Sequence, residues 1–254
     1  MLRWCSYCQE FLGEGPPYDD LRITHGVCAR CAALAVKAEH DDLAHGRALR
    51  HIHHQLVEAG AHADPSAAAR VIEEARRANV RPVDALMGLV APMLYEVGVQ
   101  WEQALISVEE EHRFTAFCEE LFELVSQRLG PPPATGAAAE QVVLMNAPGN
   151  RHRLALRLLT LWLASRHVRA WVVDEAEGLD GLRALIVRVR PRLLLISMAL
   201  PEQRPFVVSV VDGLADVRDI VPTKVIVGGY AVKKGLVAPI PGAELLADIS
   251  QLPS

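Results

Sequence analysis

Four of the five cysteines lie within the first 31 residues, where they form two Cys-x2-Cys pairs. Cys5 pairs with Cys8 and Cys28 pairs with Cys31, with 19 residues between the pairs. Thiolates at this spacing are typical of a four-cysteine zinc site. Two disulfides or four unrelated buried thiols are the alternatives, and a reducing cytoplasm disfavours the disulfides. The spacing therefore predicts a zinc-ribbon-like module over residues 1–33, either holding Zn2+ or derived from one that did.

A second set of candidate residues follows short apolar runs in the second half of the chain. His152 leads from the first run into a helical stretch, Ser197 ends the third run, and Gly228 and Gly229 end the fourth. Singly, a serine at a strand end or a glycine pair in a turn needs only a structural explanation. Together they stand where parallel strands end, which is where such sheets bind ligands.

The elements that must position these residues alternate between strand and helix. Buried strands that alternate with helices predict a parallel sheet covered on both faces, so we expect a Rossmann-like or flavodoxin-like domain over residues 140–254. The predicted strands are 141–147, 168–173, 192–197, 223–229 and 243–249, and the predicted helices are 151–167, 178–190 and 202–219.

The first half of the chain instead has the three- and four-residue apolar spacing of helices. Four amphipathic helices with short connections predict a four-helix bundle over residues 34–130, and the proline-rich stretch 131–139 predicts a linker. The helices are expected over 29–60, from an N-cap at Asp64, over 83–98 with Gly98 ending the helix, and from a Ser107–Glu110 capping box to about Arg128.

Composition narrows the class of protein. The 254 residues contain no apolar run near the roughly 18–20 residues of a membrane span, and the N-terminus lacks the pattern of a secretion signal. We therefore expect a cytoplasmic protein that does not contact a membrane.

The charge is unevenly distributed between the two halves of the chain. Residues 1–139 hold 12 Lys and Arg against 20 Asp and Glu (−8), and residues 140–254 hold 14 against 11 (+3). The acidic first half argues against direct nucleic-acid binding there.

The residues at the predicted strand ends resemble the cobalamin-binding Rossmann-like domain, whose pattern is Asp/Glu-x-His-x-x-Gly, then Ser-x-Leu, then Gly-Gly. The resemblance implies that His152 is the lower axial ligand of cobalt. It also implies that Ser197, Gly228 and Gly229 line the channel for the displaced nucleotide tail. Imidazole suits cobalt as a ligand.

Three positions depart from that pattern. Asn150 stands where the family has an acidic residue, Ala155 replaces the motif glycine, and Ser197-Met198-Ala199 replaces Ser-x-Leu. An asparagine oxygen can accept the imidazole N–H but carries no charge, so we expect His152 to be a less basic ligand with a weaker bond to cobalt.

The segment Trp101-x9-Glu111-His112 resembles the signature of CarH-type photoreceptors, in which a helical bundle caps the upper face of adenosylcobalamin. The resemblance implies that Trp101 packs against the adenosyl group and that Val108, Glu111 and His112 belong to the same contact surface. Those regulators carry a DNA-binding domain where this chain has the cysteine pairs. They also have a light-state histidine ligand where this chain has Glu102, so the same bis-histidine adduct cannot form.

These resemblances predict a non-enzymatic light sensor that binds cobalamin and signals through an unidentified protein effector or through self-association. The alternatives are a corrinoid carrier protein for methyl transfer and a cofactor-free interaction scaffold. The histidines between His40 and His62 leave open a second chromophore, biliverdin or another bilin.

Overall fold

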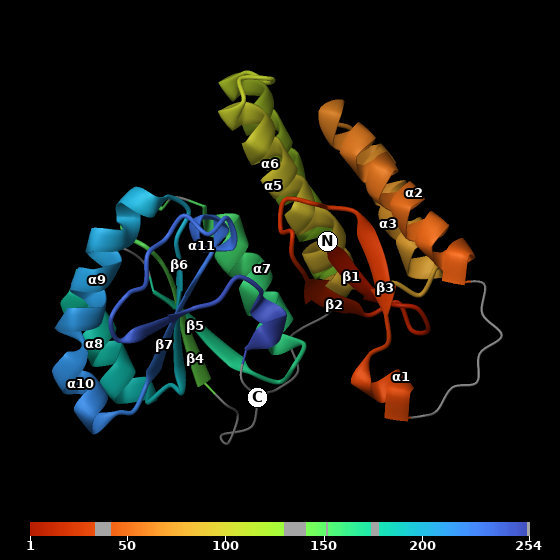
Figure 1. The fold of residues 1–254 in the computed structure, drawn as a ribbon. Coiled ribbons are helices and arrows are strands. Elements are labelled where there is room, and N and C mark those ends of the chain that lie inside the picture. Colours follow the sequence, from red (N-terminus) through yellow and green to blue (C-terminus); the bar gives the residue numbers. More distant parts are fainter. Residues whose placement is uncertain (34–41, 130–140, 151, 174–177, 253–254) are drawn as a thin grey trace. The chain divides into compact units, whose positions relative to one another are not determined.

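The computed structural model describes residues 1–33, 42–129, 141–150, 152–173 and 178–252 (Figure 1). The chain divides into two compact units, Met1–Pro131 and Pro132–Ser254. The predicted linker 131–139 lies outside the described residues.

Unit 1 begins with a small mixed sheet of three strands in the order β2-β1-β3. Strand β1 (Leu2–Cys5) pairs antiparallel with β2 (Phe11–Glu14) and parallel with β3 (Ile23–Gly26). The short helix α1 (Ala29–Ala33) follows. Residues 1–33, which the sequence predicted as a module of their own, are part of unit 1.

The rest of unit 1 is the predicted four-helix bundle. In Figure 1, α2 runs beside α3 and α5 runs beside α6, as their contacts also show. The third helix is one continuous segment in which a five-residue π-helix joins α4 to α5. The bounds are α2 Asp42–Ala61, α3 Pro65–Arg77, α4 Pro82–Ala85, the π-helix Leu86–Val90, α5 Ala91–Glu102 and α6 Val108–Leu129.

Two predicted helix starts are confirmed by their caps. The Asp64 carboxylate accepts hydrogen bonds from the main-chain N–H groups of Ser66 and Ala67, both at 3.0 Å. At the start of α6, the Glu110 carboxylate accepts the Ser107 N–H at 2.8 Å, while the Ser107 hydroxyl accepts the Glu110 N–H at 3.2 Å. Both contacts satisfy N–H groups that a helix leaves unpaired in its first turn.

One predicted helix end is wrong: Gly98 does not stop the third helix, which continues to Glu102. Glycine weakens a helix by about 1 kcal/mol relative to alanine but does not by itself end one. The helix ends where Ala104 takes a positive φ of 55° and its N–H bonds the Trp101 carbonyl at 2.9 Å. The extension places Trp101 in the last turn of α5.

The helical segment Pro82–Trp101 is long and apolar enough to cross a membrane, but 61% of its apolar window is buried inside the structure. Burial of that kind is typical of the core helix of a soluble protein.

Unit 2 is the predicted parallel sheet with helices on both faces. In Figure 1, α7 covers one face of the sheet and α8, α9 and α10 cover the other. The strands are β4 Gln141–Asn146, β5 Arg169–Val173, β6 Leu193–Ser197, β7 Lys224–Gly228 and β8 Ala243–Leu245, and the helices are α7 Arg153–Ala164, α8 Gly178–Val189, α9 Arg204–Gly213, α10 Ala215–Ile220 and α11 Tyr230–Lys233.

Two elements of unit 2 are shorter than the sequence predicted. The predicted helix 202–219 is interrupted at Leu214, which adopts φ −101° and ψ 0° between α9 and α10. The last strand ends at Leu245 instead of Ile249. In both places the apolar pattern continues past the point where the backbone changes direction, and so periodicity alone extends the element too far.

The strand order β5-β4-β6-β7-β8 is entirely parallel. From β4 the chain passes to β5 on one side of the sheet and then to β6 on the other. The switch point therefore lies between β4 and β6, and the crevice outside the carboxyl ends of these two strands is where sheets of this kind bind ligands.

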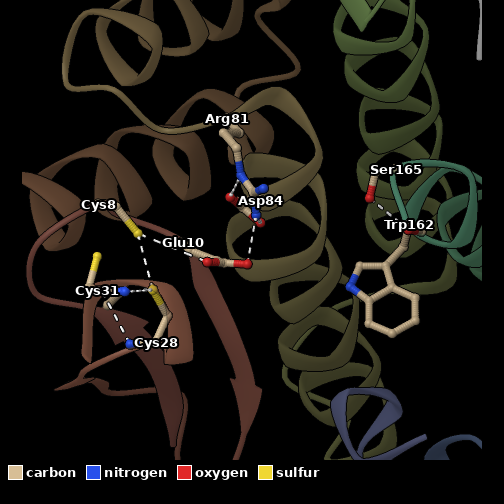
Figure 2. A network of polar contacts seen from close by, with 9 residues as sticks. Cys8, Glu10, Cys28, Cys31, Arg81, Asp84, Trp162 and Ser165 are labelled. Carbon is tan, nitrogen blue, oxygen red and sulfur yellow. Dashed lines mark hydrogen bonds and ion pairs between the residues drawn. The ribbon is translucent and has the colours of Figure 1, made fainter. Parts of the chain in front are cut away.

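One buried carboxylate joins the small sheet of unit 1 to its bundle. Asp84 in α4 is only 2% exposed, and Arg81 binds it through Nε at 2.6 Å and Nη2 at 3.0 Å. The second contact of Arg81 is Glu10, 3.3 Å from Nη2 (Figure 2). Burial raises the pKa of Asp84, and Arg81 offsets part of that effect.

We expect Arg81→Gln to lower the free energy of unfolding of unit 1 by about 2 kcal/mol, because the buried Asp84 carboxylate loses its charged partner. Arg76→Gln is the matched control, since Arg76 binds Glu73 at the same three-residue spacing on the exposed surface of α3. That change should have little effect. Equal denaturant midpoints for the two variants would contradict this account.

Candidate functional site

The loop after β4 is held by a buried side-chain amide. Asn150 is 6% exposed. Its Nδ2 donates to the carbonyl of Ser197 at 3.0 Å, and its Oδ1 accepts the main-chain N–H of His152 at 3.1 Å. The same loop is tied to β6 by the N–H of Ala147, which also donates to the Ser197 carbonyl, at 2.8 Å. The loop that carries His152 is therefore fixed to the neighbouring strand.

The His152 side chain is exposed at the start of α7. His152 is the N-cap residue of α7, but its side chain makes no capping hydrogen bond. Its carbonyl accepts a long hydrogen bond of 3.4 Å from Asn146 Nδ2. The main chain is thus anchored while the imidazole stays accessible at the carboxyl edge of the sheet.

The Asn150 oxygen does not do what the sequence suggested. We expected it to accept the imidazole N–H of His152, but it accepts the main-chain N–H of that residue instead. The side chain is short and lies two residues before His152, so it closes a local turn with the backbone in the manner of an Asx turn.

Strand register places the other predicted residues beside this loop. Asn146 at the end of β4 is paired with Ser197 at the end of β6, and Ser197 is paired with Gly228 at the end of β7. The N–H of Met198 donates to the Gly228 carbonyl at 2.8 Å. Three adjacent strand ends therefore bring His152, Ser197 and Gly228 to one edge of the sheet.

The two glycines at this edge are required by the chain's own backbone. Gly229 has φ +100°, and a Cβ there would lie 2.5 Å from the Met198 carbonyl oxygen. A Cβ on Gly228 would lie 3.0 Å from the Leu246 carbonyl oxygen. The glycine pair thus has a structural reason to be present, and its role in lining a nucleotide channel stays a prediction.

Sequence reasoning missed Gln203, which shapes the loop after β6. This side chain is 6% exposed, and its Oε1 accepts the N–H groups of Ala199 and Leu200 at 2.9 and 3.0 Å. The signal that could have identified it is a glutamine a few residues after the end of a strand. Such a side chain can bond the free N–H groups of the turn, and a buried amide needs partners of this kind.

The predicted cap residues of unit 1 lie around the turn between α5 and α6. Trp101 is 48% exposed and Val108 is 53% exposed. The Glu111 carboxylate accepts the Thr115 hydroxyl at 2.8 Å and lies 3.5 Å from His112 Nε2. The His112 side chain is exposed. The indole, the valine and the imidazole are thus exposed around this turn, whereas the Glu111 carboxylate is partly buried.

A cavity of about 190 Å3 lies among α2, α5 and α6 and reaches the turn that joins α5 to α6. It is lined by Met93 and Gln100 from α5 and by Glu110 and Phe114 from α6. Trp101, Val108, Glu111 and His112 are not among its lining residues.

The four N-terminal cysteines converge as the sequence predicted. The sulfur atoms of Cys5, Cys8, Cys28 and Cys31 all lie within 4.8 Å of one another, and none is in a disulfide. Among the described residues no other group of three or more His, Cys, Asp or Glu side chains converges in this way. The chemistry of four thiolates suits a tetrahedral zinc ion.

The thiols of this cluster differ in acidity. Burial raises the pKa of Cys31 to about 12. Burial also acts to raise the pKa of Cys5, but main-chain N–H donors from Cys28, Cys8 and Tyr7 outweigh it and lower the pKa to about 7. N–H groups directed at sulfur stabilise the thiolate, which is the form that binds metals.

The helical part of this site matches a known family. Residues 52–125 match the B12 binding domain family. The matched segment runs from α2 into α6 and includes the whole α5–α6 turn with Trp101 and Glu111. The match supports a chain that binds cobalamin. No curated protein sequence matches the chain.

One solved structure shares the fold, and two others align less well. The monomethylamine corrinoid protein of Methanosarcina barkeri aligns with a TM-score of 0.61 at 18% identity, over 78% of this chain and 91% of its own. The methanol:cobalamin methyltransferase complex of the same organism aligns with a TM-score of 0.40 at 16% identity, over 87% of this chain and 84% of its own. A cobalamin-binding protein of Desulfitobacterium hafniense DCB-2 aligns with a TM-score of 0.37 at 13% identity, over 77% of this chain and 92% of its own. At 0.61, the first of these shows that the chain has the fold of a helical bundle followed by a Rossmann-like domain.

We expect Gly229→Ala to destabilise unit 2 by about 3 kcal/mol, because the new methyl group meets the Met198 backbone in addition to the cost of a positive φ. Gly235→Ala is the matched control: Gly235 also has a positive φ, of 68°, but open space surrounds it. Its cost should be about 1 kcal/mol. Denaturant unfolding of both variants measures the difference, and a smaller loss for Gly229→Ala would refute the steric explanation.

Proposed function

We propose that the chain is a cytoplasmic, non-enzymatic light sensor that binds cobalamin, with adenosylcobalamin bound in the dark. The observation that carries this proposal is the set Trp101, Val108, Glu111 and His112, which lies within the segment that matches the B12 binding domain family. Trp101, Val108 and His112 are exposed, and Glu111 is partly buried. Large apolar side chains exposed together commonly mark a binding surface.

His152 would be the lower ligand of the cobalt. Its imidazole is exposed on an anchored loop at the switch point of the sheet, and neutral imidazole is a good ligand for cobalt. The Asn150 oxygen is engaged by the main chain, so it does not orient the ring or increase its basicity as a carboxylate would. We therefore infer a weaker bond to cobalt than a carboxylate-paired histidine would make.

Trp101 and Glu111 would hold the upper ligand. The indole offers a flat apolar surface to a purine. The Glu111 carboxylate can exchange the Thr115 hydroxyl, its present partner at 2.8 Å, for a ribose hydroxyl without losing a hydrogen bond. Val108 extends the apolar surface, and His112 adds a second polar group beside Glu111.

When bound, cobalamin supplies a cobalt–carbon bond that light breaks. Trp101 and Glu111 lose their contacts when the upper ligand leaves, so the α5–α6 turn gains freedom to adopt a second arrangement. Because Glu102 stands where CarH-type regulators have a histidine ligand, the same bis-histidine adduct cannot form in the light. The signal would pass to a partner protein or to a second copy of the chain.

A corrinoid carrier for methyl transfer is the second candidate. The fold shared with the monomethylamine corrinoid protein at a TM-score of 0.61 is common to both functions, so the choice between them depends on the upper ligand. A cofactor-free scaffold is the third candidate. It is favoured by Asn150 and Gly229, because the fold requires both residues even without a cofactor.

We expect the purified chain to take up adenosylcobalamin in darkness, to remain coloured after desalting, and to change its visible spectrum under green light. Retention of methylcobalamin alone, with turnover by a methyltransferase, would establish the carrier instead. If the chain stays colourless with every corrinoid, the cofactor-free scaffold is the candidate that remains.

His152→Ala should shift the spectrum of bound cobalamin and weaken binding by at least about 10- to 100-fold, which is the loss typical when only a hydrogen-bonding partner of a metal ligand is removed. His167→Ala is the control, because His167 is an exposed histidine just beyond the opposite end of α7. Identical spectra for the two variants would exclude His152 as the ligand.

Trp101→Ala should weaken the binding of adenosylcobalamin roughly tenfold and leave that of hydroxocobalamin unchanged, because only the first has an adenosyl group for the indole to contact. Leu105→Ala, in the same turn and 69% exposed, is the control. An equal loss for both cobalamins would show that the indole does not contact the upper ligand.

A further inference from the structure

We infer that Cys5, Cys8, Cys28 and Cys31 bind one structural Zn2+ ion, and that this ion holds the N-terminal sheet against the π-helix from which α5 runs to Trp101. The inference rests on contacts within unit 1 and does not depend on cobalamin binding.

The sulfur atoms have the spacing that a tetrahedral ion needs. With zinc about 2.3 Å from each sulfur, neighbouring sulfurs lie about 3.8 Å apart. Cys8 and Cys28 are 3.6 Å apart, and all four sulfurs lie within 4.8 Å of one another. The N–H of Cys28 is directed at the Cys5 sulfur at 3.4 Å, and that of Cys31 at the Cys28 sulfur at 3.3 Å. The backbone thus already positions two of the four ligands.

Cationic side chains accompany the cluster. A zinc ion with four thiolates carries a net charge of about −2, which needs compensation when it is partly buried. Arg30 hydrogen-bonds with Cys8, and Arg81 interacts with the same cysteine through its charge. Arg30 comes from α1 and Arg81 from the start of α4, so the compensating charges come from two separate elements.

The polypeptide between the cysteine pairs is bonded to the bundle. Glu10 lies two residues after Cys8, with Oε2 at 4.0 Å from the Cys8 sulfur, and its Oε1 binds Arg81 (Figure 2). Asp84 accepts both Arg81 and the main-chain N–H of Phe11 in β2. A polar path therefore runs from the cysteine cluster to the first turn of α4.

Apolar packing makes the second connection. Trp4 lies directly before Cys5, and its ring stands 5.3 Å from that of Phe11. Both rings pack on Gly88 in the π-helix, where a Cβ would lie only 2.7 Å from the Phe11 ring. Strands β1 and β2, which flank the first cysteine pair, thus cover the π-helix directly. Any loosening of these strands removes that cover.

The small sheet has too little core to hold its own shape. Its three strands have four residues each, and a segment below about 40 residues needs a metal, disulfides or a partner surface to stay folded. The four cysteines join the end of β1, the turn that follows it, and the start of α1. An ion bound by them closes the sheet, and we therefore expect its removal to destabilise both β1–β2 and the helix that they cover.

The test uses the chain of 254 residues. Elemental analysis should find one zinc per chain in the wild type and in Cys118→Ser, whose thiol is buried in α6 far along the sequence from the cluster. Cys8→Ser should lose the metal. Zinc absent from the wild type after expression with added zinc, or present equally in Cys8→Ser, would overturn the site.

Hydrogen exchange read by mass spectrometry tests the link to the bundle. Treatment with a chelator should accelerate exchange in peptides from residues 82–102 roughly tenfold or more and leave β4, β6 and β7 of unit 2 unchanged. No change in 82–102, or an equal change throughout the chain, would overturn the link.

Asp84→Asn separates the ion from its connection to the bundle. The variant keeps all four cysteines and should keep one zinc, but it weakens the Arg81 contact. The chelator should therefore have a smaller effect on residues 82–102 than in the wild type. An undiminished effect would show that the polar path plays no part.

Discussion

The candidate cofactor edge of unit 2 depends on one buried amide, which connects the loop after β4 to the end of β6. Asn150 both donates to the Ser197 carbonyl and accepts the His152 N–H. An ionised carboxylate at this position could only accept hydrogen bonds, so it could not bind the carbonyl. The asparagine thus fixes the loop through two contacts, and the residue at this position gives the His152 imidazole no charged partner.

Several motif residues are explained by the fold before any ligand is considered. Gly229 must lack a Cβ because the Met198 backbone lies against it, and Asn150 is needed by its loop. Residues that the fold does not require are therefore better indicators of a ligand. Trp101, Val108 and His152 are of this kind, because all three are exposed side chains at the end of an element.

Unit 1 places two sites along one continuous helical segment. The cysteine cluster and the rings of Trp4 and Phe11 lie near its start, around Asp84 and Gly88, and the exposed indole of Trp101 lies near its end. The π-helix between them is held by the N-terminal sheet, and local departures from α-helical geometry are frequent where a helix serves a function. The stability of this segment thus bears on both sites.

The sequence by itself determined the classes and most positions of the elements, the converging cysteines, and the caps at Asp64 and Ser107, because each depends on short-range spacing. It missed the extension of α5 past Gly98, the π-helix, Gln203 and the double role of Asn150. These features depend on partners that folding brings together, such as Asn150 with Ser197, 47 residues away. Periodicity reports which face of an element is buried, but only the tertiary structure decides which atom a buried polar group will meet.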